Sequence, residues 1–488
     1  MSESLLVSRW VFLRLLGLVY LVAFASLWMQ VDGLIGATGI LPAPDFLREI
    51  SEVVGASRYW WLPTLFWLAP SDAMLHALCA AGCALAILLV IGIAPTACLA
   101  ALWVCYLSLC TIGQDFLSFQ WDILLLETGF LAIFFAPLTL RESPAHAPAP
   151  PPTVVWLLRW LLFRLMFSSG AVKLLSGDAA WRSLNALQFH YWTQPLPTWI
   201  GWYANLLPAW FQRTSCALMF AIELAVPCLI WIGTIPRRIA FVPLVGLQIL
   251  ILLTGNYCFF NVLAIALCLL LLDDRAWPAR VRGRFGSAAA SGKAWPRWIV
   301  APVGGLVVAL SVLQIFSPRP LGVEWPEALQ SFRRTAAPLR IVNSYGLFAV
   351  MTTTRPEIIL EGSDDGASWS EYEFRWKPGD LSRAPAFVEP HQPRLDWQMW
   401  FAALGSYRQN PWFVVFVYRL LEGSPAVTRL LLTNPFPARP PRYVRAALYQ
   451  YRFTDLAERR ASGNWWKRER QEDLYFPQVS LESFRRAP

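Results

Sequence analysis

Apolar residues fill the first two thirds of the chain in long runs, which short polar segments separate. Many of these runs approach the ~20 residues that a helix needs to cross a bilayer. The pattern therefore predicts a polytopic bundle of about eight or nine membrane-spanning helices. The predicted spans are residues 10–31, 73–93, 95–112, 120–138, 154–175, 214–232, 239–253, 257–272 and 298–316.

The pattern changes after residue 316, where short stretches alternate polar and apolar positions as half-buried strands do. Residues 362–366 (GSDDG) supply the turn residues that a hairpin needs. The chain is thus predicted to be mostly α, with a membrane domain over residues 1–316 and a soluble α+β domain with an antiparallel β-sheet over residues 317–488. The predicted strands of this tail are residues 341–350, 357–360, 371–376 and 443–453, and its predicted helices are residues 397–409 and 411–421.

Composition and charge agree with a membrane location. Hydrophobic residues make up 56% of the chain and charged residues only 15%, against about a quarter in soluble proteins. The net charge of +9 comes largely from arginines at the ends of apolar runs, so we predict no nucleic-acid partner. If the N-terminus is inside, most of these arginines fall in cytoplasmic loops. This orientation places the loop 176–212 and the tail together on the extracytoplasmic side.

All nine cysteines lie in the apolar part, without a His or acidic companion at metal-ligand spacing. We interpret them as small packing residues and predict no metal site. Residues 143–153 are rich in Pro and Ala, and residues 283–294 in Gly, Ser and Ala, so both are expected to be cytoplasmic connectors. The first apolar run lacks a convincing cleavage site, and we expect it to be retained as the first span.

The stretch 164–208 is the best candidate for a functional site, because it forms a polar and aromatic turn between two spans. Lys173, the only lysine in the first 292 residues, lies near the outer end of an apolar run. One hypothesis is a desolvated lysine that acts as a base. The alternative is a lysine that extends to the lipid headgroups and anchors its helix.

His190 and Tyr191 form a second polar cluster, beside Gln194 and Pro195. The functional hypothesis is a groove for a substrate or client, in which His190 acts as acid or base. The alternative is an interfacial segment whose aromatic rings lie at the headgroup level.

Ionisable residues within the predicted spans need partners in their apolar surroundings. We expect a structural ion pair of Arg164 with Glu127 or Glu223, and the alternative is a proton path or a polar cavity. Asp122 and Glu127 fall at the same predicted depth as Lys173, which favours a cavity. The intramembrane polar residues are Asp122, Glu127, Arg159, Arg164 and Glu223.

Several long motifs lie along the chain. They are FRLMFSSGAVKLLSGD-x2-W at 163–181, FHYWTQPLP at 189–197, GNYCFFNVLAIALCLLLLDD at 255–274, IVNSYGLF at 341–348, RLDWQMWFAAL at 394–404, NPFPARPPRYVRAALYQYRF at 434–453 and WWKRER at 465–470. These motifs resemble the lipase maturation factor family over nearly the whole chain. That resemblance implies a multi-spanning protein with a chaperone-like role, which helps exported clients such as secreted lipases to fold or assemble.

The resemblance also bears on location and on binding residues. The chain ends in SFRRAP, without a recognisable retention signal, and its arginine-rich composition resembles bacterial members of the family. We therefore expect the bacterial inner membrane with the tail outside, or the endoplasmic reticulum membrane if the chain is eukaryotic. The candidate binding residues on the matching motifs are Asp178, Trp181, Phe189, Tyr191, Gln194, Pro195, Asn343, Tyr345, Asp396, Trp397 and Asn434.

A shorter pattern, F-x-x-G-x-x-K-L followed by a tryptophan, resembles the membrane core of vitamin K-dependent carboxylases. In that family a lysine at the matching place serves as the base. The similarity implies a membrane enzyme in which Lys173, with His190 as its partner, acts on a lipid, quinone or peptide. The residues of the pattern are Phe167, Gly170, Lys173, Leu174 and Trp181.

Other signatures of catalysis are missing from the sequence. The chain contains no P-loop, no dinucleotide fingerprint, no HExxH and no GxSxG, so we predict no cofactor and assemble no catalytic triad. Asp364 and Asp365 lie in the predicted hairpin turn, and we interpret them as turn formers rather than calcium ligands. The predicted partners are the lipid bilayer and exported client proteins.

Overall fold

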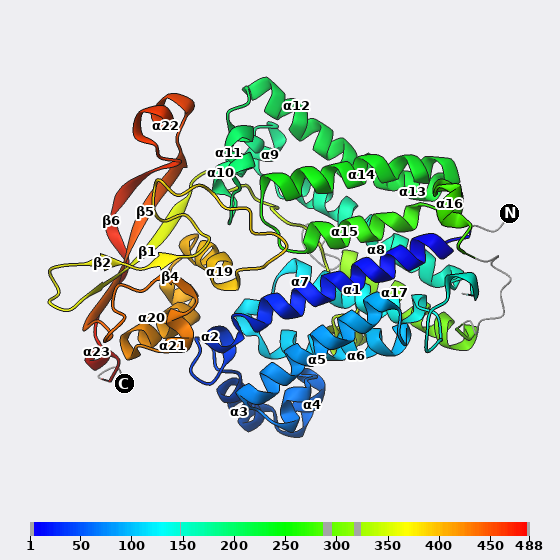
Figure 1. Ribbon diagram of the computed structural model, residues 1–488, viewed down its shortest axis with the longest axis horizontal. Helices are drawn as coiled ribbons and strands as arrows, with labels where there is room; N and C mark the ends of the chain where they lie inside the picture. Colours follow the sequence, from blue (N-terminus) through cyan, green and yellow to red (C-terminus); the bar gives the residue numbers. More distant parts are fainter. Residues whose placement is uncertain (1–3, 147, 286–294, 317–323, 486–488) are drawn as a thin grey trace.

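The structure, a computed structural model, describes residues 4–146, 148–285, 295–316 and 324–485. A helical bundle forms one end of the molecule and a β-sheet the other (Figure 1). Seven helices among the described residues are long and apolar enough to cross a membrane, and the predicted helical membrane bundle is confirmed. They are α1 (Leu6–Trp28), α5 (Asp72–Ile91), α6 (Pro95–Ile112), α8 (Pro152–Leu175), the helical segment Ala209–Ile232, α14 (Thr234–Thr254) and α17 (Arg297–Phe316).

Two of the predicted spans form shorter helices inside the bundle. Helix α7 (Gln120–Phe135) has 16 residues, and α15 (Phe260–Cys268) has nine before it tightens into a 3₁₀ turn, η7 (Leu269–Leu271). Both bury most of their side chains, because the longer helices surround them. Every predicted span therefore coincides with a helix, but these two are not among the seven of membrane-spanning length.

Helix ends follow local sequence signals. The Ser71 hydroxyl accepts a hydrogen bond from a backbone amide in the first turn of α5, and Gly92, at a φ of +83°, ends that helix. A proline in the first turn opens both α6 and α8. Helix α8 therefore begins at Pro152, inside the predicted connector 143–153. Most of the other predicted connector, residues 286–294, lies outside the described residues.

The segment that follows α8 is helical only in short pieces, which lie at the sheet end of the bundle (Figure 1). The next span is interrupted, since Pro227 has no backbone donor and the helix widens just before it. The short helices are α9 (Ala179–Arg182), α10 (Leu187–Thr193) and α11 (Trp199–Asn205). The interrupted span consists of α12 (Ala209–Phe220), a π-helical turn η5 (Ala221–Ala225), a 3₁₀ turn η6 (Val226–Cys228) and α13 (Leu229–Ile232).

The tail contains a four-stranded antiparallel sheet in the order β2-β1-β5-β6, which confirms the predicted sheet. Ile358 pairs with Leu448, and Ala447 pairs with Leu474. The strands are β1 (Pro356–Ser363), β2 (Ser370–Glu371), β5 (Tyr443–Phe453) and β6 (Trp466–Val479), and β3 (Glu373–Phe374) pairs separately with β4 (Leu431–Thr433). The helices of the tail are α18 (Glu327–Ala336), α19 (Arg394–Ala403), α20 (Pro411–Glu422), α21 (Pro425–Thr428), α22 (Leu456–Ser462) and α23 (Leu481–Arg485).

Two predicted strands of the tail are wrong, and one strand was missed. The predicted strand 371–376 is divided between β2 and β3, which belong to different sheets. Residues 341–350 form no strand, because the polar groups of this segment form hydrogen bonds with the helical bundle and not with a neighbouring strand. The longest strand, β6, was not predicted, since its charged sequence WKRERQED has no apolar alternation. It pairs along nearly the whole length of β5, whose bounds match the prediction.

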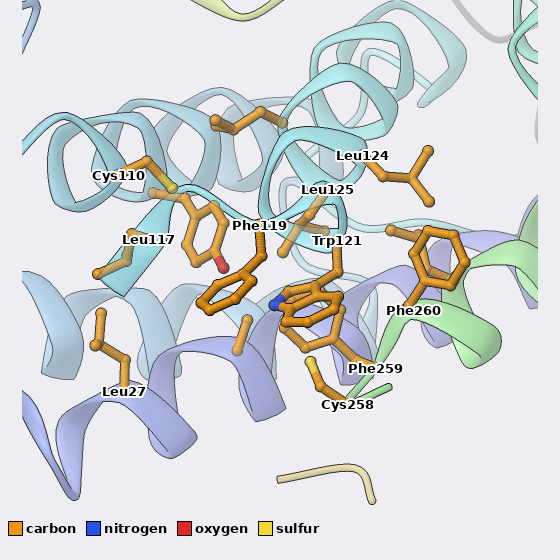
Figure 2. Packing of buried hydrophobic residues seen from close by; sticks show 14 of the residues in the cluster. Leu27, Cys110, Leu117, Phe119, Trp121, Leu124, Leu125, Cys258, Phe259 and Phe260 are labelled. Atoms are coloured by element: carbon orange, nitrogen blue, oxygen red, sulfur yellow. The ribbon is translucent and has the colours of Figure 1, made fainter. Parts of the chain in front are cut away.

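One hydrophobic core continues from the bundle into the tail. Figure 2 shows the side chains of Phe119 and Trp121 close together at the start of α7, with Cys258 nearby. The rings of Phe119 and Trp121 stack with centroids 4.7 Å apart, and Trp397 of α19 meets Trp121 edge-on, also at 4.7 Å. All nine cysteines are free, and most are buried as packing residues. The tail is thus packed against the end of the bundle.

Candidate functional site

Lys173 and Glu223 form an ion pair inside the bundle. The Lys173 ammonium donates to both oxygens of the Glu223 carboxylate, at 2.8 and 2.7 Å, and neither residue is more than 6% exposed. The ammonium also lies 5.4 Å from the centroid of the Trp181 ring. Lys173 therefore does not extend to the headgroups, and the amino group that a catalytic base would use is engaged by a carboxylate.

Gly170 and the π-helical turn explain how this pair forms. Gly170 lies three residues before Lys173 on α8, so both positions are on the same side of the helix. A Cβ at Gly170 would lie 2.9 Å from Leu224 and 3.0 Å from the Cβ of Glu223. Only glycine lets η5 approach α8 this closely, and η5 carries Glu223 at its centre. The Gly-x-x-Lys spacing is thus a packing requirement of the ion pair.

Arg164, on the same helix, pairs with Glu127 of α7 and not with Glu223. Glu127 also accepts hydrogen bonds from the backbone amide of Asn343, at 2.9 Å, and from the Tyr345 hydroxyl, at 2.7 Å. This buried carboxylate is therefore fully partnered, and it ties the segment 341–350 to the bundle. Arg159 donates to the backbone carbonyl of Leu270 at 3.0 Å, near the end of α15.

A directed chain of hydrogen bonds leads to His190. Gln194 Nε2 donates to the carbonyl of Thr254 at 2.7 Å, so its Oε1 is the acceptor for the Tyr257 hydroxyl at 2.8 Å. That hydroxyl has only one proton, so His190 Nε2, 3.3 Å from the Tyr257 oxygen, must be the donor to it. The proton of the neutral imidazole therefore lies on Nε2, and Nδ1 is left as an acceptor.

His190 Nδ1 is buried and has no hydrogen-bond partner among the described residues. Burial, and after it the charge of Lys173, lowers the pKa of His190 to about 4. The imidazole is consequently neutral near pH 7. A neutral ring with an unused acceptor atom is able to take a hydrogen bond from a ligand or to accept a proton.

A cavity of about 390 Å³ brings Lys173, Glu223 and His190 together between α8, α10, α12 and α14. We call it the bundle cavity. Lys173 and His190 were predicted to belong to one site, and the structure places both on its wall. Gln248 and Tyr257 were not among the predicted site residues, although a glutamine inside an apolar run was an available signal. Further lining residues are Met166, Trp181, Tyr191, Leu247, Gln248, Tyr257 and Phe348.

A second cavity, of about 460 Å³, is an open groove where the loop 176–212 meets the sheet. We call it the outer groove. The Arg452 guanidinium lies 5.6 Å from the ring centroid of Trp192, and Lys467 pairs with Glu458 at 2.6 Å. The groove thus combines aromatic, amide and cationic groups. Its lining includes Gln188, Phe189, Trp192, Asn205 and Gln212 from the loop side and Arg452, Phe453 and Lys467 from the sheet.

The wall between the two cavities is held by the tail. The buried Arg355 donates to the backbone carbonyls of Trp192 and Pro195, each at 2.8 Å, and to that of Gln194. Trp400 of α19 donates its indole N–H to the carbonyl of Thr193, also at 2.8 Å. Backbone groups in the predicted FHYWTQPLP motif are therefore fixed by tail side chains, and Pro195 contributes through its carbonyl to this contact.

Other predicted binding residues have structural contacts. Asp178 caps α9 by accepting from the backbone amide of Trp181 at 3.0 Å. Buried Asp396 accepts from the amides of Trp376 and Lys377, each at 2.9 Å, and burial raises the pKa of its carboxyl. Asn434 accepts from a backbone amide two residues on, at 2.9 Å, as a turn residue does. None of Asp178, Asp396 and Asn434 lines the outer groove.

The predicted hairpin turn contains no sign of a calcium site. The Asp365 carboxylate accepts from the amides of Ala367 and Ser368, at 2.8 and 2.7 Å, and these bonds hold the pKa of this carboxyl well below its usual range. Asp364 pairs with Arg439 at 3.0 Å. Within the described ranges, no three His, Cys, Asp or Glu side chains gather as a metal site requires. The two aspartates are therefore engaged as turn and surface residues.

Known proteins match this chain over nearly its whole length. The lipase maturation factor transmembrane domain matches residues 7–279, and the lipase maturation factor C-terminal domain matches residues 341–477. Lipase maturation factor 2 of Gallus gallus is 38% identical, with 97% of this chain and 81% of the relative covered. The Homo sapiens protein of that name is also 38% identical, at 97% and 82% coverage. Lipase maturation factor 1 of Bos taurus is 37% identical, at 98% and 90% coverage.

No solved structure matches this chain. The two domain matches include the helices of the bundle apart from α17, the loop between α8 and α12, and the strands β1, β5 and most of β6. The bundle cavity and the outer groove are both built from residues in the matched ranges. From the extent of these matches and the identity to the curated relatives, the chain belongs to the lipase maturation factor family.

Proposed function

We propose that this protein is a multi-pass membrane factor that assists the maturation of exported lipases by holding a client segment in the outer groove. Family membership supports a lipase client, since the relatives are named lipase maturation factors. The outer groove is the observation that carries the proposal. It is open, it is built by both the loop 176–212 and the sheet, and the tail fixes its inner wall.

The lining of the groove suits an extended, partly folded chain. Phe189, which is partly exposed beside the buried Trp192, offers aromatic surface to apolar client side chains. Gln188 and Asn205 supply amide groups that pair with an exposed backbone. Arg452 adds an exposed positive charge for acidic positions. Binding of this kind shields apolar client surface until the client has folded.

We further propose that the groove faces the extracytoplasmic side, in the bacterial inner membrane or in the endoplasmic reticulum membrane of a eukaryotic cell. The loop 176–212 and the sheet lie at one end of the bundle, and α16 (Ala279–Arg282) lies at the other (Figure 1). Helix α16 carries Arg280 and Arg282 beside further basic residues. Basic loops stay on the cytoplasmic side, so the sheet end faces outward.

Charge reversal in the groove tests the client proposal. Arg452→Glu places a negative charge on the groove wall, whereas Arg470→Glu makes the same change on the exposed surface of the neighbouring strand. We expect Arg452→Glu to reduce the yield of active secreted lipase from co-expressing cells by about tenfold, the scale of 1–2 kcal/mol of lost binding. Equal yields of active lipase with both variants, at equal amounts of membrane factor, would contradict client binding in the outer groove.

The second candidate function is a membrane enzyme that uses Lys173 as a base. The bundle cavity favours it, because Lys173, Glu223 and His190 all line this one cavity. The bidentate contact of Lys173 with Glu223 weighs against it, since catalysis would first have to release the amino group. The two candidates predict different results when both Lys173 and Glu223 are replaced. Client binding in the outer groove should continue without the ion pair, whereas base catalysis requires Lys173.

A further inference from the structure

We propose that the bundle cavity binds an uncharged membrane lipid whose polar end carries a free hydroxyl group, as a monoacylglycerol or diacylglycerol does. The acyl chain would lie along the apolar wall, and the hydroxyl would donate to His190. This site is separate from the outer groove and does not depend on the client proposal.

The position of the cavity gives access from the bilayer. Leu250 of α14 and Phe211 of α12 lie at its rim and are 61% and 42% exposed on helices of membrane-spanning length. Apolar side chains exposed on such helices face lipid tails. Deeper in the cavity, Met166, Leu247 and Phe260 continue the apolar surface. A molecule with a hydrocarbon chain can thus enter sideways without leaving an apolar environment.

The charges on the wall favour a neutral ligand. Lys173 and Glu223 are the only charged residues among those that line the cavity in the described part of the chain, and they neutralise each other. An anionic headgroup would need a cation of its own, and taking Lys173 would leave Glu223 as a buried unpaired carboxylate. The cavity volume of about 390 Å³ lies within the range of small-molecule sites.

The unpaired atom of His190 specifies a hydroxyl donor. The hydrogen bonds of Gln194 and Tyr257 fix the His190 proton on Nε2 and leave Nδ1 as a buried acceptor without a protein partner. Burying such an acceptor unpaired is destabilising, and a hydroxyl entering the cavity removes that cost. An ester or ether has no proton to give, so it does not replace the hydroxyl.

Photolabelling of the full-length protein in nanodiscs tests the proposal. The probe is a dioleoylglycerol with a diazirine in one acyl chain, and the competitors are unlabelled dioleoylglycerol, its acetylated ester and phosphatidylglycerol. We expect labelled peptides from α8 and α14, and about tenfold weaker competition by the ester, as one unmade hydrogen bond implies. Equal competition by all three lipids would show bulk lipid contact only and would overturn the proposal, as would preferred phosphatidylglycerol binding.

Two variants locate the site. Leu247→Trp fills the cavity, whereas Val242→Trp adds the same ring to an exposed position of the same helix. We expect only Leu247→Trp to abolish labelling, and unchanged labelling would overturn the proposal.

A third variant, His190→Phe, tests the hydroxyl contact. It should still bind the acyl chain, but dioleoylglycerol and its ester should compete equally well. A retained preference for dioleoylglycerol contradicts the role of Nδ1. If a variant fails to fold, the competition series on the unaltered protein still decides.

Discussion

Arg394 and Asp122 form a fully buried, two-pronged ion pair that joins the tail to the bundle. Arg394 at the start of α19 donates through Nη2 and Nη1 to the two oxygens of Asp122 in the first turn of α7, at 2.8 and 2.9 Å. Tyr106 donates to the same carboxylate at 2.5 Å, and Arg394 also donates to the carbonyl of Phe116 at 2.6 Å. A bidentate pair of this geometry fixes orientation as well as distance.

Breaking this ion pair should disrupt the interface between the tail and the bundle. We predict that Arg394→Ala lowers the stability of the folded protein by about 3–5 kcal/mol, because it leaves Asp122 buried without its cation. Thermal unfolding of the purified protein in detergent measures the effect. The matched control is Arg439→Ala, which removes an arginine from the exposed pair with Asp364 and should cost at most about 1 kcal/mol. Equal losses in both variants contradict the prediction.

The close approach of η5 to α8 gives a second prediction. Gly170→Ala places a Cβ 2.9 Å from Leu224, so the π turn must shift, and we expect a loss of about 1–3 kcal/mol in stability. Gly246→Ala in α14 meets nothing within 4 Å and should be stabilising by about 0.5–1 kcal/mol through helix propensity alone. Unfolding midpoints that move in the same direction for the two variants would argue against this packing.

Removing the Lys173–Glu223 pair in steps separates structure from catalysis. We predict that Lys173→Met alone is destabilising by about 3–5 kcal/mol, because Glu223 is left unpaired, and that Lys173→Met with Glu223→Leu recovers most of that loss. The double variant should also recover lipase maturation when expressed with a client. A stable double variant without any maturation activity would support the enzyme candidate instead.

Glu389 makes stability depend on pH. Burial raises the pKa of this carboxyl to about 8 from its ordinary value of 4.5. Between these pH values the folded protein holds a proton that the unfolded chain has lost, so the free energy of unfolding falls as the pH rises through this window. Glu389→Gln cannot ionise. From pH 5 to pH 8 its free energy of unfolding should therefore rise by a few kcal/mol relative to that of the unaltered protein, at about 1.4 kcal/mol per pKa unit.

Unfolding midpoints measured at pH 5 and pH 8 check this change. The control is Glu472→Gln, at an exposed carboxylate of β6, which should follow the unaltered protein at both pH values. A pH-independent difference between Glu389→Gln and the unaltered protein contradicts the shifted pKa.

Much of the fold was predictable because hydrophobic periodicity acts locally. The apolar runs predicted the seven helices of membrane-spanning length and the buried helices α7 and α15, and the alternation in 443–453 predicted β5 with its bounds. The strand β6 was not predictable in this way, since its charged residues lie on an exposed strand and its pairing with β5 is a tertiary contact. The strand prediction for 341–350 was wrong although the local pattern is strand-like. Residues of this segment form hydrogen bonds with Glu127 of the bundle, which the local pattern does not show.

The candidate site was predictable in its location but not in its pairings. Lys173 and His190 stood out as rare polar residues near a span end, and both line the bundle cavity. The partner of Lys173 could not be read from sequence spacing, since Glu223 lies 50 residues away. Asp122 pairs with Arg394 of the tail, 272 residues further along the chain, and only tertiary packing determines such a pair. Gly170 was visible in a motif, but its role required the position of η5.

Client contact in the outer groove is the central claim, and site-specific crosslinking during maturation tests it most directly. A photoactivatable amino acid at Asn205, on the groove wall, is compared with the same amino acid at Arg470, on the exposed sheet surface, in cells that co-express a secreted lipase. We predict a covalent product with immature lipase from Asn205 and none from Arg470. Crosslinks of equal yield from both positions, or from neither, would contradict binding in the groove.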